Sequence, residues 1–353
     1  MQSFVYTASS SRIVFGSNSI DRLPEELERL GLKRTLVLCT PGQRDQAMAV
    51  ADRLAGRVAG IFDGATMHVP IEVAHKAQEA ARALGADSAL AVGGGSTVGL
   101  GKAIALESGL PVIAVPTTYA GSEATPIYGI TEAGVKRTGR DPRVLPRVVI
   151  YDPRLSLSLP MGLTVTSTIN AMAHAAEGLY AHDGNPVIAL MAEEGLRACA
   201  TALEPLRQNP QDLAARTQAL YGAWLCGTVL GAVSMGLHHK LCHTLGGSFD
   251  LPHSDVHTAI LAHAMQYNAA AAPQAMARIA RALGVEDAAF GIHELGRIQG
   301  ATMSLRDIGM PADGLDRAAD LAAANPYPNP RPLERDALRR MLERAYRGQP
   351  PAD

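Results

Sequence analysis

The pattern of apolar residues changes near residue 155, and this change constrains the fold more than any other feature of the sequence. Before it, short β-branched runs alternate with helix-like segments such as Ile20–Leu30 and Ile71–Leu84. The predicted strands are Ile13–Phe15, Thr35–Cys39, Ala89–Val92, Pro111–Val115 and Val148–Tyr151. Such alternation favours a largely parallel sheet that is covered by helices on both faces. We therefore predict an α/β domain over residues 1–155.

The rest of the chain has a helical pattern. Long stretches rich in alanine and leucine follow Pro160, and β-branched runs become few. The predicted helices include Ser167–Ala181, Pro186–Ala202, Asp212–Met235, Leu315–Ala324 and Glu334–Ala345. We therefore predict an all-helical domain over residues 156–353.

The composition excludes several classes of protein. Of the 353 residues, 47% are hydrophobic and 19% are charged, which is unlike a disordered chain. The 32 basic and 34 acidic residues give a net charge of −2, so the molecule as a whole has no affinity for nucleic acid or an anionic membrane surface.

Cysteine usage and the N-terminus indicate where the protein works. The four cysteines are scattered, and no Cys-x-x-Cys pair is present, so neither a disulfide framework nor a thiolate zinc site is expected. The first residues lack the pattern of a signal peptide, and no apolar stretch approaches the roughly 20 residues of a spanning helix. We expect a soluble protein of the cytoplasm.

Two loops rich in small residues follow successive predicted strands. Gly93–Ser96 comes directly after a buried strand and precedes the helical segment Thr97–Leu106. Glycines let the backbone approach a ligand closely, and the N–H groups at a helix start favour a phosphate. The spacing is not Gly-x-Gly-x-x-Gly, and a strand–helix turn without a ligand is the simpler alternative. The second loop, Pro116–Glu123, makes ligand binding the favoured interpretation, since ligands of open α/β sheets bind at the carboxyl ends of strands.

Histidines are concentrated in the predicted helical domain. Six of the eleven lie between residues 238 and 263, although a single histidine is more often an ordinary core or surface residue. His239 and His243 share a helix face, as do Asn170 and His174 on an earlier helix. Gly246 and Gly247 are expected to end the helix that carries His239 and His243, which we call the histidine helix. The chain is then expected to bring His253 back towards these two residues. Such a set can hold a metal or an anionic group between helices.

With these residues the chain resembles the iron-containing alcohol dehydrogenase family. The motifs that carry the resemblance are Gly93-Gly-Gly-Ser96, Pro116–Glu123, Asn170-x3-His174-x2-Glu177 and His239-x3-His243-x9-His253. The resemblance implies the dehydroquinate synthase-like fold, with an α/β dinucleotide-binding domain, an all-α domain and an active site in the cleft between them. It also implies a homodimer.

Three departures from the common family pattern narrow the resemblance to one branch. Gly99 replaces an aspartate of the glycine loop, the threonine loop is one residue shorter, and Asn170 replaces the first carboxylate ligand of the metal. The segment Asn325-Pro-Tyr-Pro-Asn-Pro-Arg331 is also typical of that branch. The branch implies that NADH or NADPH delivers hydride to the carbon–carbon double bond of 2-maleylacetate, a small dicarboxylate, giving 3-oxoadipate.

The resemblance also assigns roles to particular residues. The catalytic candidates are His243, as proton donor, and His238. The cofactor-binding candidates are Thr40, Gly94, Gly95, Ser96, Thr117, Thr118, Ser122 and Lys136. The substrate-binding candidates are Tyr119, Tyr327 and Arg331, and the metal-ligand candidates are Asn170, His174, His239 and His253. Thr40 stands where an acidic residue would repel a 2′-phosphate, so both NADH and NADPH are expected to be accepted. For the substrate carboxylates, Arg331 is the first candidate, because guanidinium binds carboxylate bidentately.

Several alternatives stay open at the level of sequence. Asn170 lacks the charge of a carboxylate, so the histidines form either a weakened iron or zinc site or a metal-free site with the same geometry. A metal-dependent alcohol or aldehyde dehydrogenase of the same family is a second function. A non-catalytic nucleotide-binding protein is a third, from another class.

Overall fold

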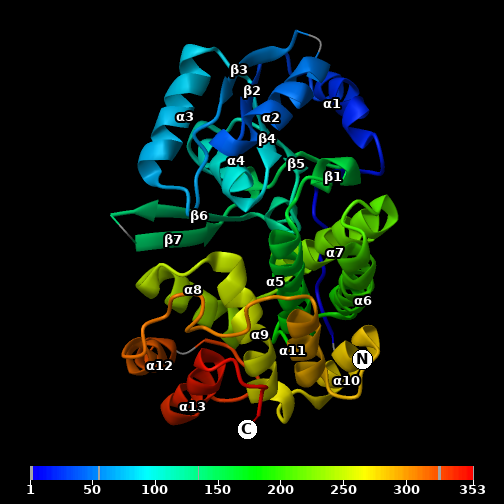
Figure 1. Ribbon diagram of the computed structural model, residues 1–353. Helices are drawn as coiled ribbons and strands as arrows, with labels where there is room; N and C mark the ends of the chain where they lie inside the picture. Colours follow the sequence, from blue (N-terminus) through cyan, green and yellow to red (C-terminus); the bar gives the residue numbers. More distant parts are fainter. Residues whose placement is uncertain (1–2, 55, 134, 325–326, 353) are drawn as a thin grey trace. The chain divides into compact units, whose positions relative to one another are not determined.

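The computed structural model describes residues 3–54, 56–133, 135–324 and 327–352. The chain divides into two compact units (Figure 1). The first unit comprises residues 8–159. The second begins at Pro160 and also includes the N-terminal residues as far as Thr7.

The first unit contains a six-stranded parallel sheet. Its strand order is β1-β8-β5-β4-β2-β3, and the bounds are Arg12–Phe15 for β1, Thr35–Leu38 for β2, Val58–Phe62 for β3, Ser88–Gly93 for β4, Val112–Pro116 for β5 and Val148–Tyr151 for β8. The predicted strands are confirmed. The prediction omitted β3 and the antiparallel hairpin of β6 (Ile127–Glu132) and β7 (Val135–Arg140).

Helices cover both faces of this sheet, as the alternation of strands and helices predicts. Successive side chains of a strand point to opposite faces. Val37 therefore packs under α1 (Leu23–Arg29) and α2 (Arg44–Ala51). Leu36 and Leu38 pack under α3 (Ile71–Ala83) and α4 (Gly95–Ser108) on the other face. The central strands are consequently buried on both sides.

In the described residues of the second unit, the regular secondary structure is entirely α-helical. Its helices are α5 (Met161–Leu179), α6 (Pro186–Gln208), α7 (Leu213–Ala232), α8 (Leu237–Phe249), α9 (His253–Ala269), α10 (Pro273–Leu283), α11 (Ala288–Ile298), α12 (Gly314–Ala324) and α13 (Arg335–Tyr346). Asn185 caps α6 through Ile188 N–H, and Asp212 caps α7 through two N–H groups. Helix α5 is buried from Thr164 to Gly178, so its sequence lacks a polar face.

Helices α6 and α7 approach each other closely at a reciprocal pair of contacts. A Cβ atom on Gly195 of α6 would lie 2.8 Å from Sγ of Cys226 on α7. Conversely, a Cβ atom on Gly222 of α7 would lie 2.6 Å from Sγ of Cys199 on α6. Each helix thus presents a glycine to the cysteine of the other. All four cysteines of the chain are buried free thiols.

The prediction that Gly246 and Gly247 end the histidine helix was wrong. Helix α8 continues through both residues to Phe249 and ends at Asp250, which has a φ of 52° in the left-handed region. An aspartate tolerates this conformation because its short side chain can bond locally. Leu241 and Leu245 pack in the core beside α9, so tertiary packing maintains the helix despite the two glycines.

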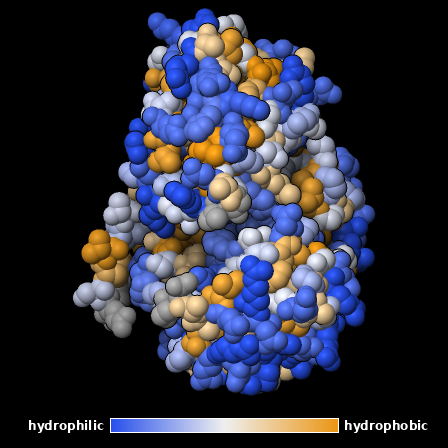
Figure 2. Space-filling model, turned by 90° about the vertical axis from the view of Figure 1, so that its left-hand side faces the viewer, coloured by the Kyte–Doolittle hydropathy of each residue, from blue (hydrophilic) through white to orange (hydrophobic). Residues whose placement is uncertain are grey.

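The surface is mixed in polarity. On the face that Figure 2 shows, hydrophobic residues lie scattered among hydrophilic ones, and the exposed large hydrophobic side chains of the molecule include Met48, Met67, Leu190 and Phe290. Hydrophobic side chains that are exposed singly are normal on a protein surface and do not by themselves indicate a binding site. Within the described residues, no single helix has the length and apolarity to cross a membrane, whereas α7 and α8 together pass that test only as a pair bent by 94°.

Candidate active site

Histidine side chains from three helices of the second unit form one cluster. The ring centroids of His174 on α5 and His239 on α8 lie 5.1 Å apart, and that of His257 on α9 lies 5.2 Å from His239. His253, the first residue of α9, lies 4.3 Å from His257. His243 lies 6.5 Å from His239 on the same helix. His239 thus lies beside His243 of its own i, i+4 pair and beside His174 of the other pair.

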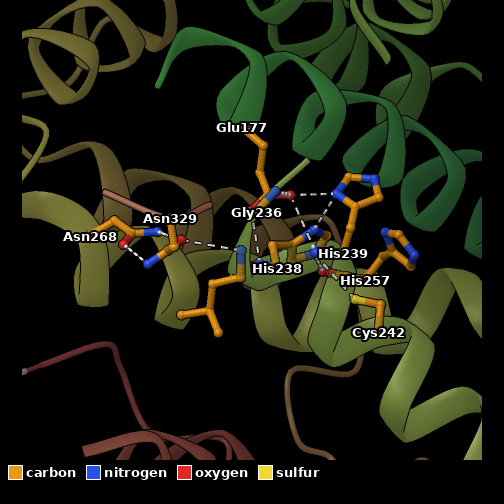
Figure 3. A network of polar contacts seen from close by, with 9 residues as sticks. Glu177, Gly236, His238, His239, Cys242, His257, Asn268 and Asn329 are labelled. Atoms are coloured by element: carbon orange, nitrogen blue, oxygen red, sulfur yellow. Dashed lines mark hydrogen bonds and ion pairs between the residues drawn. The ribbon is translucent and has the colours of Figure 1, made fainter. Parts of the chain in front are cut away.

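Glu177, a fully buried carboxylate on α5, anchors this cluster (Figure 3). It accepts Nδ1–H of His239 at 2.7 Å and the backbone N–H groups of Gly236 at 3.0 Å, His238 at 2.9 Å and His239 at 3.3 Å. The first N–H groups of a helix have no partner within it, and a carboxylate there also interacts well with the helix dipole. Because Nδ1 of His239 donates to Glu177, its Nε2 atom is left as an acceptor.

Burial keeps four imidazoles of the cluster, those of His174, His238, His239 and His257, neutral near pH 7. It is the largest cause that lowers the pKa of His239 to about 3 and that of His238 to about 4, and neighbouring histidines add to it. Burial likewise lowers the pKa of His174 and of His257 well below the usual value. A neutral imidazole retains the lone pair that binds a metal or accepts a hydrogen bond.

Several buried polar atoms of the cluster have no hydrogen-bond partner among the described residues. They are Oδ1 of Asn170, Nδ1 of His174, Nε2 of His239 and both ring nitrogens of His257. Buried polar atoms nearly always have partners, so this concentration indicates a bound ligand. Ligand atoms of His238, His239 and His257 also lie within 4.8 Å of one another. The donor set fits a divalent transition metal, for which imidazole is a suitable ligand.

His257 is the cluster member that sequence reasoning missed. It lies four residues after His253, at the spacing that connects His239 to His243, so the signal was present in the sequence. On α9 this spacing places both rings on one helix face. The prediction used His253 alone as the returning ligand, whereas the structure also brings the ring of His257 to 5.2 Å from that of His239.

The two predicted catalytic histidines have different surroundings. His243 is exposed on α8, where it can reach a bound molecule. His238 is fully buried, and its Nε2–H donates to the backbone oxygen of His257 at 3.0 Å. Sγ of Cys242 lies 3.5 Å from the same nitrogen. His238 therefore connects α8 to α9, and of the two histidines only His243 is exposed.

In the first unit, all the predicted cofactor residues except Lys136 follow the carboxyl ends of three parallel strands, β2, β4 and β5. Gly94 caps α4 after β4, and a Cβ atom there would lie 2.8 Å from Cγ2 of Thr118 in the loop after β5. After β2, Thr40 donates to Gln43 at 3.1 Å, and Gln43 donates to Thr117 at 2.9 Å. Gln43, which sequence reasoning missed, thus connects the loops that follow β2 and β5.

The departure at Gly99 has a steric explanation in the same unit. A Cβ atom at this position of α4 would lie 2.8 Å from Cγ2 of Val69. Val69 is buried and has a φ of 47°, so its backbone has little freedom to withdraw. The aspartate that is common in the family would therefore displace this valine.

Lys102, which the prediction also omitted, fixes the threonine loop from behind. Its buried Nζ donates to the backbone oxygens of Ser122 at 2.6 Å, Thr125 at 2.8 Å and Ile127 at 2.7 Å. Burial lowers the pKa of Lys102 to about 7, and the buried carboxyl of Glu123 acts in the opposite direction. Lys102 thereby joins the helix of the glycine loop to the end of the threonine loop.

The remaining predicted residues are divided between the two units. In the first unit, Gly95 and Ser96 form the start of α4, and Lys136 lies on β7. Tyr119 is buried in the same unit and donates to Ser156 at 3.3 Å. In the second unit, Tyr327 lies beneath Nζ of Lys240 at 5.6 Å. The two residues that precede Tyr327 in its proline-rich segment, Asn325 and Pro326, lie outside the described residues.

Two further buried histidines lie on α9 and α11 and give a prediction about acid stability. Burial, then His293 and Arg344, lowers the pKa of His263 to about 3. An unfolded histidine titrates near 6.5, so the stability contributed by neutral His263 is present above about pH 6.5 and is lost as the pH falls towards 3. Between about pH 7.5 and 5.5 we expect wild type to lose about 1.4 kcal/mol more than His263→Leu in urea unfolding. Equal losses of the free energy of unfolding in wild type and His263→Leu over this pH range would contradict the prediction.

The architecture and the two sets of residues define a family, and comparison with known proteins agrees. A family model described as "Iron-containing alcohol dehydrogenase" matches residues 10–153. A second, described as "Fe-containing alcohol dehydrogenase family, C-terminal", matches residues 164–346. The chain belongs to the iron-containing alcohol dehydrogenase family.

Individual relatives narrow the comparison. The chain is 62% identical to a maleylacetate reductase of Burkholderia cepacia over 352 residues, which cover 100% of both proteins. A crystal structure of maleylacetate reductase from Agrobacterium tumefaciens has a TM-score of 0.96 and 55% identity, and covers 99% of this chain and 100% of that chain. A putative alcohol dehydrogenase from Ralstonia eutropha JMP134 has a TM-score of 0.99 and 61% identity, with 100% of each chain covered.

Proposed function

We propose that the chain is a maleylacetate reductase, an NAD(P)H-dependent oxidoreductase that reduces the carbon–carbon double bond of 2-maleylacetate to give 3-oxoadipate. The observation that carries this proposal is the 62% identity over the full length of a curated maleylacetate reductase. The buried Asn170 in the histidine cluster supports the proposal further. The resemblance of the chain to the branch of the family with this activity rests in part on this asparagine.

The reaction adds a hydride and a proton to an enone. The cofactor supplies the hydride, and conjugation moves negative charge onto the ketone oxygen of the substrate, so the site must stabilise an enolate. His243, exposed on α8 beside the cluster, is the proposed proton donor. Gly94, Gly95, Ser96, Thr117 and Thr118 are proposed to hold the cofactor at the strand ends.

The predicted ligands Asn170, His174, His239 and His253 are proposed to hold a divalent metal, with His257 as a further candidate ligand. A metal bound there supplies a Lewis acid for the developing oxyanion. The residues of the chain contribute orientation and charge: Glu177 fixes the ring of His239 through Nδ1 and adds a carboxylate that offsets the missing charge of Asn170. We also propose that the enzyme works in the cytoplasm as a homodimer.

The function is tested by the oxidation of NADH and NADPH in the presence of maleylacetate. We expect turnover with either cofactor, and a decrease after treatment with a chelator that is reversed by Fe²⁺ or Zn²⁺. Absence of turnover with both cofactors and either metal would contradict the proposal. Faster oxidation of simple alcohols than reduction of maleylacetate would favour the metal-dependent alcohol dehydrogenase instead.

A further inference from the structure

One lysine stands out in the second half of the chain. Lys240 is the single lysine among residues 160–353, where every other fixed positive charge is an arginine. It lies on the histidine helix α8, between His239 and His243. A lysine ammonium is a compact charge on a flexible stem, suited to a carboxylate that must enter and leave. The following inference rests on the proposed function, in which the substrate carries two carboxylates.

Arg331, the first candidate from sequence, is engaged elsewhere. Its guanidinium stacks over the ring of Tyr267 at 4.3 Å, and its Nη1 donates to the backbone oxygen of Tyr267 at 3.4 Å. The same segment is fastened by Asn329, which exchanges hydrogen bonds with Asn268 at 3.1 and 2.7 Å and accepts the N–H of Leu237 at 3.2 Å (Figure 3). Arg331 thus anchors this segment against α9, and Asn329 connects the same segment to the start of α8.

The ammonium of Lys240 donates no hydrogen bond to any residue that the structure describes. Among the residues that the structure describes, no aspartate or glutamate forms an ion pair with it. Its Nζ lies 5.6 Å above the ring of Tyr327, a position that holds the ammonium while leaving its three N–H groups for another acceptor. The residue is half-buried, so a carboxylate bound to it is partly shielded from water.

Lys240 and His243 are neighbours on the helix surface. Residues three apart on a helix have Cβ atoms roughly 5–6 Å from each other. His243 is exposed and Lys240 is half-buried, whereas Leu241 and Leu245 face the core. A carboxylate held by Lys240 therefore places the adjoining carbon atoms of the same small molecule beside the ring of His243.

We propose that Lys240, positioned over Tyr327, binds one carboxylate of the substrate and makes the enzyme selective for dianionic enones. The interaction is a charge-assisted hydrogen bond, and no covalent step is involved. It forms in both the ground state and the transition state, so its loss raises KM more than it lowers kcat.

The test compares Lys240→Met and Lys240→Arg with wild type on three substrates. These are maleylacetate and two monocarboxylate analogues, each with a different carboxylate replaced by a methyl group. For Lys240→Met we expect kcat/KM to fall about 10- to 100-fold on maleylacetate and on the analogue that retains the bound carboxylate. On the analogue that lacks it, the fall is expected to be less than about threefold. Lys240→Arg is expected to restore most of the loss on maleylacetate.

A matched control removes an exposed lysine from the other unit. Lys76→Met loses the same charge on α3 and is expected to match wild type on all three substrates. An equal fall of kcat/KM on all three substrates for Lys240→Met would overturn the proposal, as would an unchanged KM for maleylacetate. If wild type itself fails to reduce maleylacetate, the proposed function fails first, so the two failures are distinguishable.

Discussion

Replacing His243 with alanine is expected to lower kcat for maleylacetate reduction by about 10²- to 10⁴-fold, the usual contribution of a general acid. The ring is exposed on α8 at 6.5 Å from His239, so its removal opens no cavity in the core. The free energy of unfolding is therefore expected to stay close to that of wild type. Steady-state oxidation of NADH and urea unfolding of the same preparation measure the two quantities.

A surface histidine of the same unit provides the control for this substitution. His182 is exposed in the segment between α5 and α6, and His182→Ala is expected to keep wild-type kcat. If His243→Ala retains kcat within about threefold, a loss of less than about 0.7 kcal/mol of transition-state stabilisation, the proton comes from another group.

The second large effect is expected at Glu177. In Glu177→Ala, the N–H groups of Gly236, His238 and His239 and the Nδ1–H of His239 lose their acceptor inside the protein. Each buried donor without a partner costs about 1–3 kcal/mol, so we expect the free energy of unfolding to fall by at least about 3 kcal/mol. Activity is expected to disappear as well, because the ring of His239 loses its fixed orientation. Urea unfolding and NADH oxidation measure both effects.

Glu194 offers a matched control for the loss of a carboxylate. It forms an i, i+3 ion pair with Arg197 on α6, with side-chain exposures of 36% and 47%. Exposed pairs contribute about 0–1 kcal/mol, so Glu194→Ala is expected to unfold near the wild-type urea concentration. A Glu177→Ala variant that unfolds there too would show that the carboxylate does not hold the start of α8.

The sequence predicted the central strands of the sheet well because they are buried on both faces. Val148–Tyr151 is a continuous apolar run, and its observed bounds are the predicted ones. The strand Val58–Phe62 lies at the sheet edge and is partly exposed, so its apolar pattern is weaker. The hairpin of β6 and β7 carries Lys136 and Arg137 and lies in a two-stranded sheet of its own, which leaves little apolar pattern to detect.

Within the site, the residues that spacing along one helix connects could be predicted, and those that tertiary contacts connect could not. The i, i+4 spacing indicated His239 with His243 and Asn170 with His174. The contact between Glu177 and the start of α8 joins residues 59 to 62 positions apart. Gln43 meets Thr117 across 74 positions, and no local pattern in the sequence reports such a distance.

The reciprocal contact between α6 and α7 restricts how this family member can diverge. Gly195 faces Cys226, and Gly222 faces Cys199, and a Cβ atom on either glycine would lie less than 3 Å from the opposite sulfur. At Gly222 the added Cβ atom would also lie 2.9 Å from the backbone nitrogen of Cys199 and 3.0 Å from the backbone oxygen of Gly195, and no substitution removes a backbone atom. Gly222 is therefore expected to stay glycine whatever side chain stands at position 199, so the crossing acts as a constraint on sequence drift that neither helix alone would impose.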